Sequence, residues 1–232
     1  MNDMCGIVGI IDPGGLDEQE LQDFSEMLVR CEERGHAATG AFNDAMDHAK
    51  RALPASDFVN TQEFKDFIRK SAGKTWIVGH CRLPSRGSPE DEENNHPVFI
   101  EGQEQKAMVV HNGTFYCPAH DKDTSKSDTF IALWITENDD LEGGENLMAA
   151  IEKIHGLTRD SPSVFVMGTK DALGFCKSYG KPLVFNTEGN RVAFASTEKI
   201  LGKEPAREME NSQVHCFTKQ GATWEVRDLS EE

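Results

Sequence analysis

Residues 5–12 read Cys-Gly-Ile-Val-Gly-Ile-Ile-Asp, a short apolar run rich in β-branched side chains, and the turn residues Pro13-Gly14-Gly15 follow it. An apolar run of this length between turn signals is typical of a buried strand. Because the run stands almost at the start of the 232-residue chain, the strand would carry Cys5 at its head.

Outward from this strand, helix and strand patterns follow one another. Apolar side chains at three- and four-residue spacing predict a helix over residues 17–33, with Asp17 as its N-cap. Further helices are expected near 61–71, 127–137 and 145–155, and strands near 75–80, 107–111, 163–169, 172–178, 183–187, 191–195 and as a final pair within 213–228. No repeat or low-complexity linker interrupts this order, so we expect a single α+β domain with stacked sheets.

The composition limits the classes of function. Apolar residues make up 38% of the chain and charged residues 28%, as in ordinary globular proteins. No stretch approaches the roughly 20 apolar residues that span a bilayer, and no signal-peptide pattern is present, so we expect a cytoplasmic protein without a membrane partner. The net charge of −16 argues against nucleic-acid binding, because an acidic surface repels phosphate.

Six cysteines are present, and none belongs to a C-x-x-C pair. A zinc site is therefore not predicted, and free thiols are the expected state of a chain without a secretion signal. Most lone cysteines are small buried hydrophobic residues. Cys5 taken alone would also be read as a packed strand residue.

Three further segments place chemically useful groups near strand or helix ends. Arg82 follows the predicted strand at 75–80, where its planar guanidinium suits a carboxylate; the alternative is a surface arginine paired with a nearby acid. Asn112-Gly113 could supply an amide and a backbone N–H to an oxyanion, or simply form a hairpin turn. Asp128, in Ser127-Asp128-Thr129, could hold an ammonium group, or this segment could be an N-cap.

Together these segments resemble a known family, the glutaminase domains of the class II (N-terminal nucleophile) glutamine amidotransferases. The motifs that carry the resemblance keep the family's order and approximate spacing: Met4-Cys5-Gly6-Ile7-Val8-Gly9, Arg34-Gly35 with Gly40, Gly79-His80-Cys81-Arg82, Asn95-His96-Pro97, His111-Asn112-Gly113, Ser127-Asp128-Thr129 and Phe194-Ala195-Ser196. The resemblance runs from Cys5 to about residue 205 and is nearest to the glucosamine-6-phosphate synthase type. It implies a four-layer αββα sandwich of the N-terminal nucleophile hydrolase type.

The resemblance also implies a reaction. The thiolate of Cys5 would attack the side-chain amide of L-glutamine, and the α-amino group of Cys5 would act as the base, because such an amine titrates near pH ~8. Asn112 and Gly113 would form the oxyanion hole. A γ-glutamyl thioester would form, ammonia would leave, and water would release L-glutamate. No metal or organic cofactor is implied.

Substrate binding is implied at five further positions. Arg82 would hold the α-carboxylate of glutamine and Asp128 its α-ammonium group. Ser85, where the family usually has threonine, would orient the substrate. His96 and Arg34 would shape the pocket.

Two departures from the family pattern concern the start of the chain and the loop after Arg82. Residues 1–4 precede Cys5, so we expect a leader that is removed or bypassed by a start at Met4, followed by one glutaminase domain over 5–232. Leu83-Pro84-Ser85-Arg86 replaces the frequent Trp-Ala-Thr-His, and we expect glutamine binding to survive this change.

No P-loop or other acceptor-binding motif is visible, so we expect an ammonia-accepting synthase or transferase in trans. Two alternatives remain open from the sequence. One is a domain that binds glutamine or a partner protein without turnover. The other is an N-terminal nucleophile hydrolase that acts on another amide.

Overall fold

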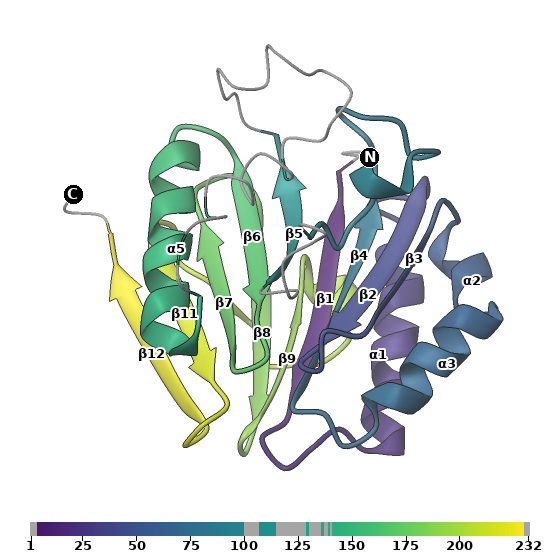
Figure 1. Ribbon diagram of the computed structural model, residues 1–232, viewed down its shortest axis with the longest axis horizontal. Helices are drawn as coiled ribbons and strands as arrows, with labels where there is room; N and C mark the ends of the chain where they lie inside the picture. The colour runs from purple at the N-terminus through teal and green to yellow at the C-terminus, as the bar shows by residue number, and fades with distance from the viewer. Residues whose placement is uncertain are drawn as a thin grey trace.

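Strands dominate the computed structural model, which describes residues 4–99, 107–114, 129, 136, 139 and 141–229 (Figure 1). Within these residues a seven-stranded sheet has the order β10-β8-β9-β1-β4-β2-β3, and a five-stranded sheet has the order β12-β11-β7-β6-β5. Every strand pair in both sheets is antiparallel. The strands of the first sheet are β1 (Gly6–Ile11), β2 (Ala38–Asn43), β3 (His48–Arg51), β4 (Trp76–Arg82), β8 (Val184–Glu188), β9 (Arg191–Ala195) and β10 (Arg207–Glu208).

The second sheet and the helices complete the described elements. The sheet contains β5 (Met108–Gly113), β6 (Ser163–Gly168), β7 (Ala172–Lys177), β11 (Gln213–Thr218) and β12 (Thr223–Asp228). The helices are α1 (Glu18–Cys31), α2 (Ala55–Phe58), α3 (Gln62–Ser71), α5 (Gly143–Thr158) and α6 (Glu198–Leu201), with a short 3₁₀ turn, η1 (Glu92–Asn94).

The strand that the sequence predicts at the chain start is β1, in the interior of the larger sheet between β4 and β9. All six of its residues are buried. Val8 and Ile10 face the layer of α1, whereas Ile7 and Ile11 face the other sheet. Burial on both faces explains why this strand is an unbroken apolar run rather than an alternating one.

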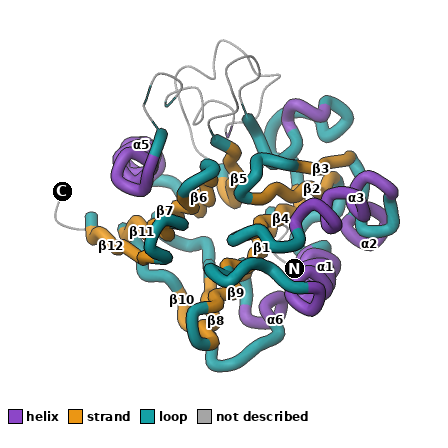
Figure 2. Tube along the Cα trace, turned by 60° about the horizontal axis from the view of Figure 1, so that its bottom comes forward, coloured by secondary structure: helices purple, strands orange, loops and turns teal. Residues whose placement is uncertain are grey.

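Three apolar layers hold the sandwich together. In the first, α1, α2, α3 and α6 cover the outer face of the seven-stranded sheet, with Phe24 and Phe64 in its core. In the second, the two sheets pack on each other through side chains that include Trp76 and Phe194. In the third, α5 covers the five-stranded sheet through Ile151. Figures 1 and 2 show α5 and the α1–α3 group on opposite sides of the strands, so the four-layer αββα prediction is confirmed.

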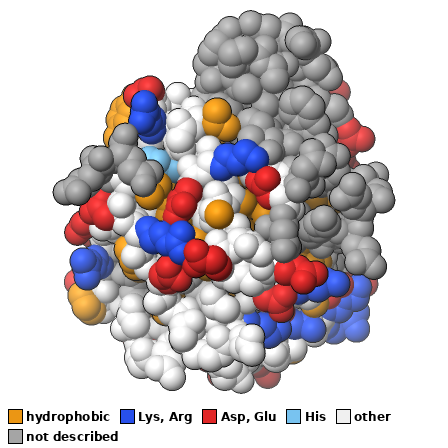
Figure 3. Space-filling view, turned by 60° about the vertical axis from the view of Figure 1, so that its left-hand side comes forward, with side chains coloured by type: hydrophobic (Ala, Val, Ile, Leu, Met, Phe, Trp, Pro, Cys, Tyr) orange, Lys and Arg blue, Asp and Glu red, His pale blue; other side chains and the backbone are white. Residues whose placement is uncertain are grey.

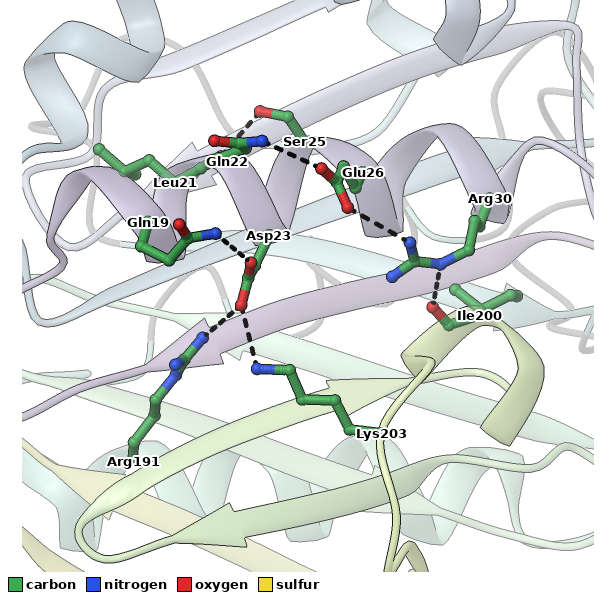
Figure 4. Close-up of polar contacts among 10 residues, drawn as sticks. All are labelled: Gln19, Leu21, Gln22, Asp23, Ser25, Glu26, Arg30, Arg191, Ile200 and Lys203. Carbon is green, nitrogen blue, oxygen red and sulfur yellow. Dashed lines mark hydrogen bonds and ion pairs between the residues drawn. The ribbon is translucent and has the colours of Figure 1, made fainter.

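Helix α1 begins at the predicted cap. The side chain of Asp17 accepts a hydrogen bond from the Glu20 N–H at 2.8 Å, and the Glu20 carboxylate accepts one from the Asp17 N–H at 2.8 Å. Farther along α1, Asp23 accepts hydrogen bonds from Arg191 and Lys203, each at 3.0 Å (Figure 4). These contacts tie the helix to β9 and to the segment after α6.

Two local predictions differ from the structure. The strand at 107–111 extends through Asn112 and Gly113, which pair with β6 as Asn112↔Val164 and Gly113↔Ser163, so the hairpin-turn alternative for Asn-Gly is wrong. In the polar region 43–74, the short elements β3 and α2 were not recognised, because elements of four residues carry little periodicity. The helix expected at 127–137 lies almost wholly outside the described residues.

The surface of the α5 and β12 side carries charges of both signs. Figure 3 shows acidic and basic side chains next to one another there, rather than a patch of one sign. Arg227, for example, pairs with Glu145, Glu152 and Glu225. In the part of the chain that the structure describes, no helix has the length and apolar character needed to cross a membrane.

Candidate functional site at one end of the sandwich

The candidate residues converge because three strand ends meet at one end of the sandwich. Strand β1 starts there, and the antiparallel β4 ends there, so Gly6 pairs with Cys81. Strand β5 also ends there and contacts β1 (Figure 1). Cys5, Arg82 and Asn112-Gly113 are therefore brought together from segments far apart in the sequence.

The side chains also point into the same layer. Along β1, Ile7 and Ile11 face the five-stranded sheet, and Cys5 continues their alternation. Along β5, Met108 and Val110 face the seven-stranded sheet, and Asn112, two residues farther along the strand, points to the same face. The thiol and the amide therefore approach the gap between the sheets from opposite sides.

Cys5 is half-buried, and its thiol lies against the backbone of the residue after Arg82. The Sγ atom accepts a hydrogen bond from the Leu83 N–H at 3.3 Å and lies 3.3 Å from the Leu83 carbonyl oxygen. Only backbone atoms of Leu83 make this contact, so it does not depend on the leucine side chain.

Arg34 forms hydrogen bonds with the backbone on both sides of the peptide bond between Met4 and Cys5. Its Nε donates to the Cys5 carbonyl at 2.9 Å, and its own carbonyl accepts from the Met4 N–H at 3.2 Å. Burial lowers the pKa of the Arg34 guanidinium, although the nearby Cys31, Cys5 and Glu33 oppose the change. The buried Nη2 of Arg34 has no hydrogen-bond partner among the described residues.

Asn112 is fully buried, with 0% exposure, yet neither its side-chain nitrogen nor its oxygen has a partner in the described part of the chain. Leaving a buried amide unpaired costs about 1–3 kcal/mol. A buried amide without a described partner, at the place where three strand ends meet, is a candidate for binding a ligand atom.

Gly113 supplies a backbone donor beside this amide. β5 is the last strand of its sheet among the described residues, and Val109 exchanges hydrogen bonds with Val98 at 2.9 and 3.0 Å on the side away from β6. Because backbone direction alternates along a strand, the N–H of Gly113 also points away from β6. Gly113 has φ +153°, and a Cβ there would lie 2.4 Å from the Pro162 oxygen, so only glycine fits.

Arg82 is buried, and its guanidinium is held by the loop that follows it. Nη1 donates to the Asn95 side-chain oxygen at 2.8 Å, and Nη2 donates to the carbonyls of Arg86 and Gly87 at 2.5 and 2.9 Å. A guanidinium held in this way is a planar group of N–H donors of the kind that binds carboxylates.

Three buried histidines lie behind the site. The rings of His80 and His96 are 4.0 Å apart, and His96 Nε2 lies 2.8 Å from the Thr129 hydroxyl, which is also 3.1 Å from His111 Nδ1. Burial is the main cause that lowers the pKa of His80 to about 3, and it also holds the pKa of His96 well below its usual range. These two rings are therefore neutral.

Of the two remaining predicted site residues, the structure describes only one. Ser85 is exposed on the loop after Arg82, and its hydroxyl makes no hydrogen bond to another described residue. Asp128 lies outside the described residues, although the adjacent Thr129 is described and buried.

Four residues at the site were missed by sequence reasoning. Leu83 contacts the thiol through its backbone, and His80 lies behind the site. The Ser196 hydroxyl accepts from the Ile7 N–H at 2.9 Å, which fixes the start of β1, and Lys181 contacts the Met4 sulfur at 2.6 Å. His80 and Ser196 stand within motifs that the sequence singles out, but no local pattern identifies Lys181.

Within the described ranges, no group of three or more His, Cys, Asp or Glu side chains is arranged to hold a metal ion. The chemistry available among the described residues is a thiol, an amide without a partner in that part of the chain, a backbone N–H on the edge of β5 and buried guanidinium groups. Such a set can activate a carbonyl carbon toward a sulfur nucleophile without a cofactor.

Comparison with known proteins gives a relationship in structure and none in sequence. No family model matches the chain, and no curated protein matches it by sequence. Glutamine phosphoribosylpyrophosphate amidotransferase from B. subtilis, complexed with ADP and GMP, superimposes with a TM-score of 0.72 at 16% identity over 98% of this chain and 50% of that one. The structure of the allosteric regulatory enzyme of purine biosynthesis gives 0.73 at 16% identity over the same shares.

A shorter protein also matches. A glutamine aminotransferase class-II domain protein from Silicibacter pomeroyi superimposes with a TM-score of 0.57 at 12% identity, over 97% of this chain and 99% of that one. The chain thus spans about half the length of the first two structures and nearly all of the third. It has the fold of the class II, N-terminal nucleophile glutamine amidotransferases.

Proposed function

We propose that this chain hydrolyses L-glutamine to L-glutamate and ammonia through a γ-glutamyl thioester on Cys5. The observation that carries the proposal is the Asn112 side chain, which is fully buried, unpaired within the described residues and directed into the same layer as Cys5. An oxyanion would satisfy its Nδ2 together with the N–H of Gly113.

The reaction follows from these groups. The α-amine of a free Cys5 takes the thiol proton, and the thiolate attacks the γ-carbonyl carbon of glutamine. Asn112 and Gly113 hold the oxygen of the tetrahedral intermediate. The proton passes to the amide nitrogen, the C–N bond breaks, ammonia leaves, and water hydrolyses the thioester to glutamate.

Glutamine is a zwitterion, so a selective site needs an anchor of each charge. Arg82 would bind the α-carboxylate through its guanidinium, and Asp128 would bind the α-ammonium group. Ser85 would orient the substrate from the loop. His96 and Arg34 would shape the pocket, His96 from its place beside His80 and Arg34 by holding the Cys5 carbonyl.

The mechanism requires that Cys5 carries the N-terminal amine. A peptide nitrogen cannot accept a proton at neutral pH, so a chain in which Met4 remains bonded to Cys5 would lack the base. We therefore propose that residues 1–4 are removed, or that translation starts at Met4 and this methionine is then removed, before the domain of residues 5–232 becomes active.

Ammonia release from glutamine tests this proposal. The chain that begins at Cys5 should release ammonia and glutamate in equal amounts, and the chain that begins at Met1 should not. Cys5→Ala should abolish the reaction, while Cys216→Ala, in β11, should retain it. Asn112→Leu should lower kcat by about 10²–10³-fold, as removal of an oxyanion donor does.

A second function is favoured by one observation. Met4 is held in place, because its N–H donates to the Arg34 carbonyl and its sulfur contacts Lys181. A chain that retained this contact would bind glutamine without turnover, as a sensing or interaction domain. Calorimetry with glutamine on the Met1 form separates the two: binding without ammonia release from either form would support the sensing function.

The proposed product also points to a partner. Free ammonia would be wasted, so we propose that an acceptor synthase or transferase uses it in trans and that the reaction takes place in the cytoplasm. Purification from native extract should recover an ammonia-accepting enzyme with the chain. Recovery of a lone monomer with full glutaminase activity would contradict this.

A further inference from the structure

The proposed nucleophile and its oxyanion donors belong to different sheets. Cys5 stands at the head of β1 in the seven-stranded sheet, whereas Asn112 and Gly113 end β5 in the five-stranded sheet. The two sheets pack mainly through apolar side chains, and such contacts have little directional preference. A directional contact at this end of the sandwich must therefore fix the position of β5 relative to β1.

His80 makes a directional contact between the sheets at this place. It lies in β4 opposite Ile7, one residue pair from Gly6↔Cys81. Its side chain is 1% exposed and continues the alternation of Trp76 and Val78 toward the other sheet. Its Nε2 lies 3.0 Å from the carbonyl oxygen of His111 in β5.

Chemistry determines the proton position in this contact. A carbonyl oxygen only accepts, so Nε2 of His80 must carry the hydrogen and donate it. Nδ1 is then a bare lone pair, and it has no partner among the described residues. The ring of His96, 4.0 Å away, packs against the His80 ring and fixes its plane.

The acceptor is the backbone group next to both oxyanion donors. The His111 carbonyl shares a peptide plane with the N–H of Asn112. It also lies on the edge of β5 that faces away from β6, the edge from which the Gly113 N–H points, because residues 109, 111 and 113 alternate with those bonded to β6. The bond from His80 therefore holds the edge that presents the donor.

We propose that His80 is a positioning residue that holds the edge of β5 opposite β6 at a fixed offset from β1, so that the Asn112 amide and the Gly113 N–H face the Cys5 thiol. This role rests on the proposed glutaminase function, since it concerns the oxyanion hole of that reaction. His80 touches no reacting atom. Its effect on the rate is transmitted through the β5 backbone.

A pair of substitutions separates this role from simple core filling. His80→Gln keeps an N–H donor near the position of Nε2, and His80→Met keeps the volume but loses the donor. His155→Met is the matched control, because His155 is also a buried histidine but lies on α5, away from the site. If His80→Met does not fold, His80→Asn, whose amide is too short to reach His111, replaces it.

The readout compares transition-state binding with ground-state binding. In His80→Met, kcat for glutamine should fall about 10²-fold, while KM and the affinity for the product L-glutamate stay within about threefold. The affinity for L-glutamate γ-semialdehyde, which forms a tetrahedral adduct with the thiol, should fall in step with kcat. His80→Gln should recover most of both losses, and His155→Met should change neither.

Three results would overturn the proposal: equal losses in His80→Gln and His80→Met, an unchanged semialdehyde affinity, or a rise in KM that accounts for the whole effect. Amide hydrogen exchange at residues 111–113 gives a readout independent of turnover, and it should speed up in His80→Met but not in His80→Gln. If the parent chain releases no ammonia, the glutaminase function fails, while the exchange result still decides whether His80 positions β5.

Discussion

At the scale of single residues, two residues of the candidate site are in energetically unfavourable states in the folded chain. Asn112 is buried without a partner in the described chain, and Gly113 adopts a backbone conformation that a side chain would disfavour. Strain and unpaired groups persist where surrounding structure holds them in place, and they cluster at functional sites. Both residues are therefore better explained by a ligand than by folding alone.

Gly113→Ala should lower both activity and stability. A Cβ would lie 2.4 Å from the Pro162 oxygen and 2.7 Å from His111 Nε2, so the end of β5 must shift. We expect a loss of about 1–3 kcal/mol in the free energy of unfolding, measured with urea, and a larger proportional loss of ammonia release. Gly156→Ala, at an exposed position in α5 with open space around it, should instead stabilise by up to about 1 kcal/mol.

The free energy of unfolding should fall as the pH is lowered below about 6.5, where an ordinary histidine titrates. His80 has a pKa lowered to about 3, and the pKa values of His96, His48, His155 and His215 are also lowered, all chiefly by burial. In the unfolded chain these histidines take up protons near pH ~6.5, whereas the same rings in the folded chain stay neutral at that pH. The contribution of these neutral rings to the free energy of unfolding is therefore fully present above about pH 6.5 and is lost as the pH falls toward 3.

Urea unfolding between about pH 7.5 and about pH 5 measures this dependence, since carboxylates titrate little in that range. Each buried histidine contributes a slope of at most about 1.4 kcal/mol per pH unit. His80→Gln should reduce the slope. A stability that stays level or rises on acidification through this window would contradict the neutral assignment of these rings.

At the scale of elements, the helices depend on local signals that the sequence displays. The capping box of Asp17 and Glu20 starts α1, and the Thr61 side chain caps α3 by accepting from the Phe64 N–H at 3.2 Å. α1 then packs its apolar face on β1 and β4. The C-terminal end of this helix lies behind the start of β1, where Cys31 faces Gly6, so the first turn lies toward the opposite end of the sandwich.

Asp17→Ala should destabilise the fold by about 1 kcal/mol without changing the chemistry of the site. The substitution removes the acceptor for the Glu20 N–H, and alanine cannot replace it. Thermal and urea unfolding measure the loss. Asp17→Ser, which retains a capping oxygen, should recover most of it, and equal losses in both variants would argue against the capping explanation.

At the scale of the whole molecule, the central layer between the sheets decides whether the two halves of the site meet. Phe194 lies there, edge-on to Phe175 with ring centroids 5.0 Å apart. Gly9 leaves room for it, since a Cβ at Gly9 would lie 2.2 Å from the Phe194 ring. This contact joins β1, β9 and β7, and so joins both sheets.

Phe194→Ala should therefore cost about 3–5 kcal/mol, as removal of a buried aromatic ring does. Because the cavity would open between the sheets, ammonia release should fall by more than the folded fraction alone predicts. Val29→Ala, at an exposed position on α1, is the control and should change the stability by less than about 0.5 kcal/mol. An unfolding free energy unchanged by Phe194→Ala would contradict the central role of this layer.

The sequence by itself determined the local elements and the kinds of chemical group. The apolar run at 5–12, the Asp17 cap and the period of α1 act over a few residues, so they can be read without knowing the fold. Only the tertiary structure decided which sheet each strand joins, that Asn112 and Gly113 end a strand rather than form a turn, and that Arg82 is held by its own loop.

The physical reason is the range of the interactions. β1 pairs with β4 and β9, whose residues lie about 70 and 185 positions away in the register, and no local pattern specifies such partners. The contact between His80 and His111 depends on how two whole sheets stack. The chain thus encodes Cys5, Asn112 and Gly113 locally, while their meeting at one end of the sandwich is a property of the assembled layers.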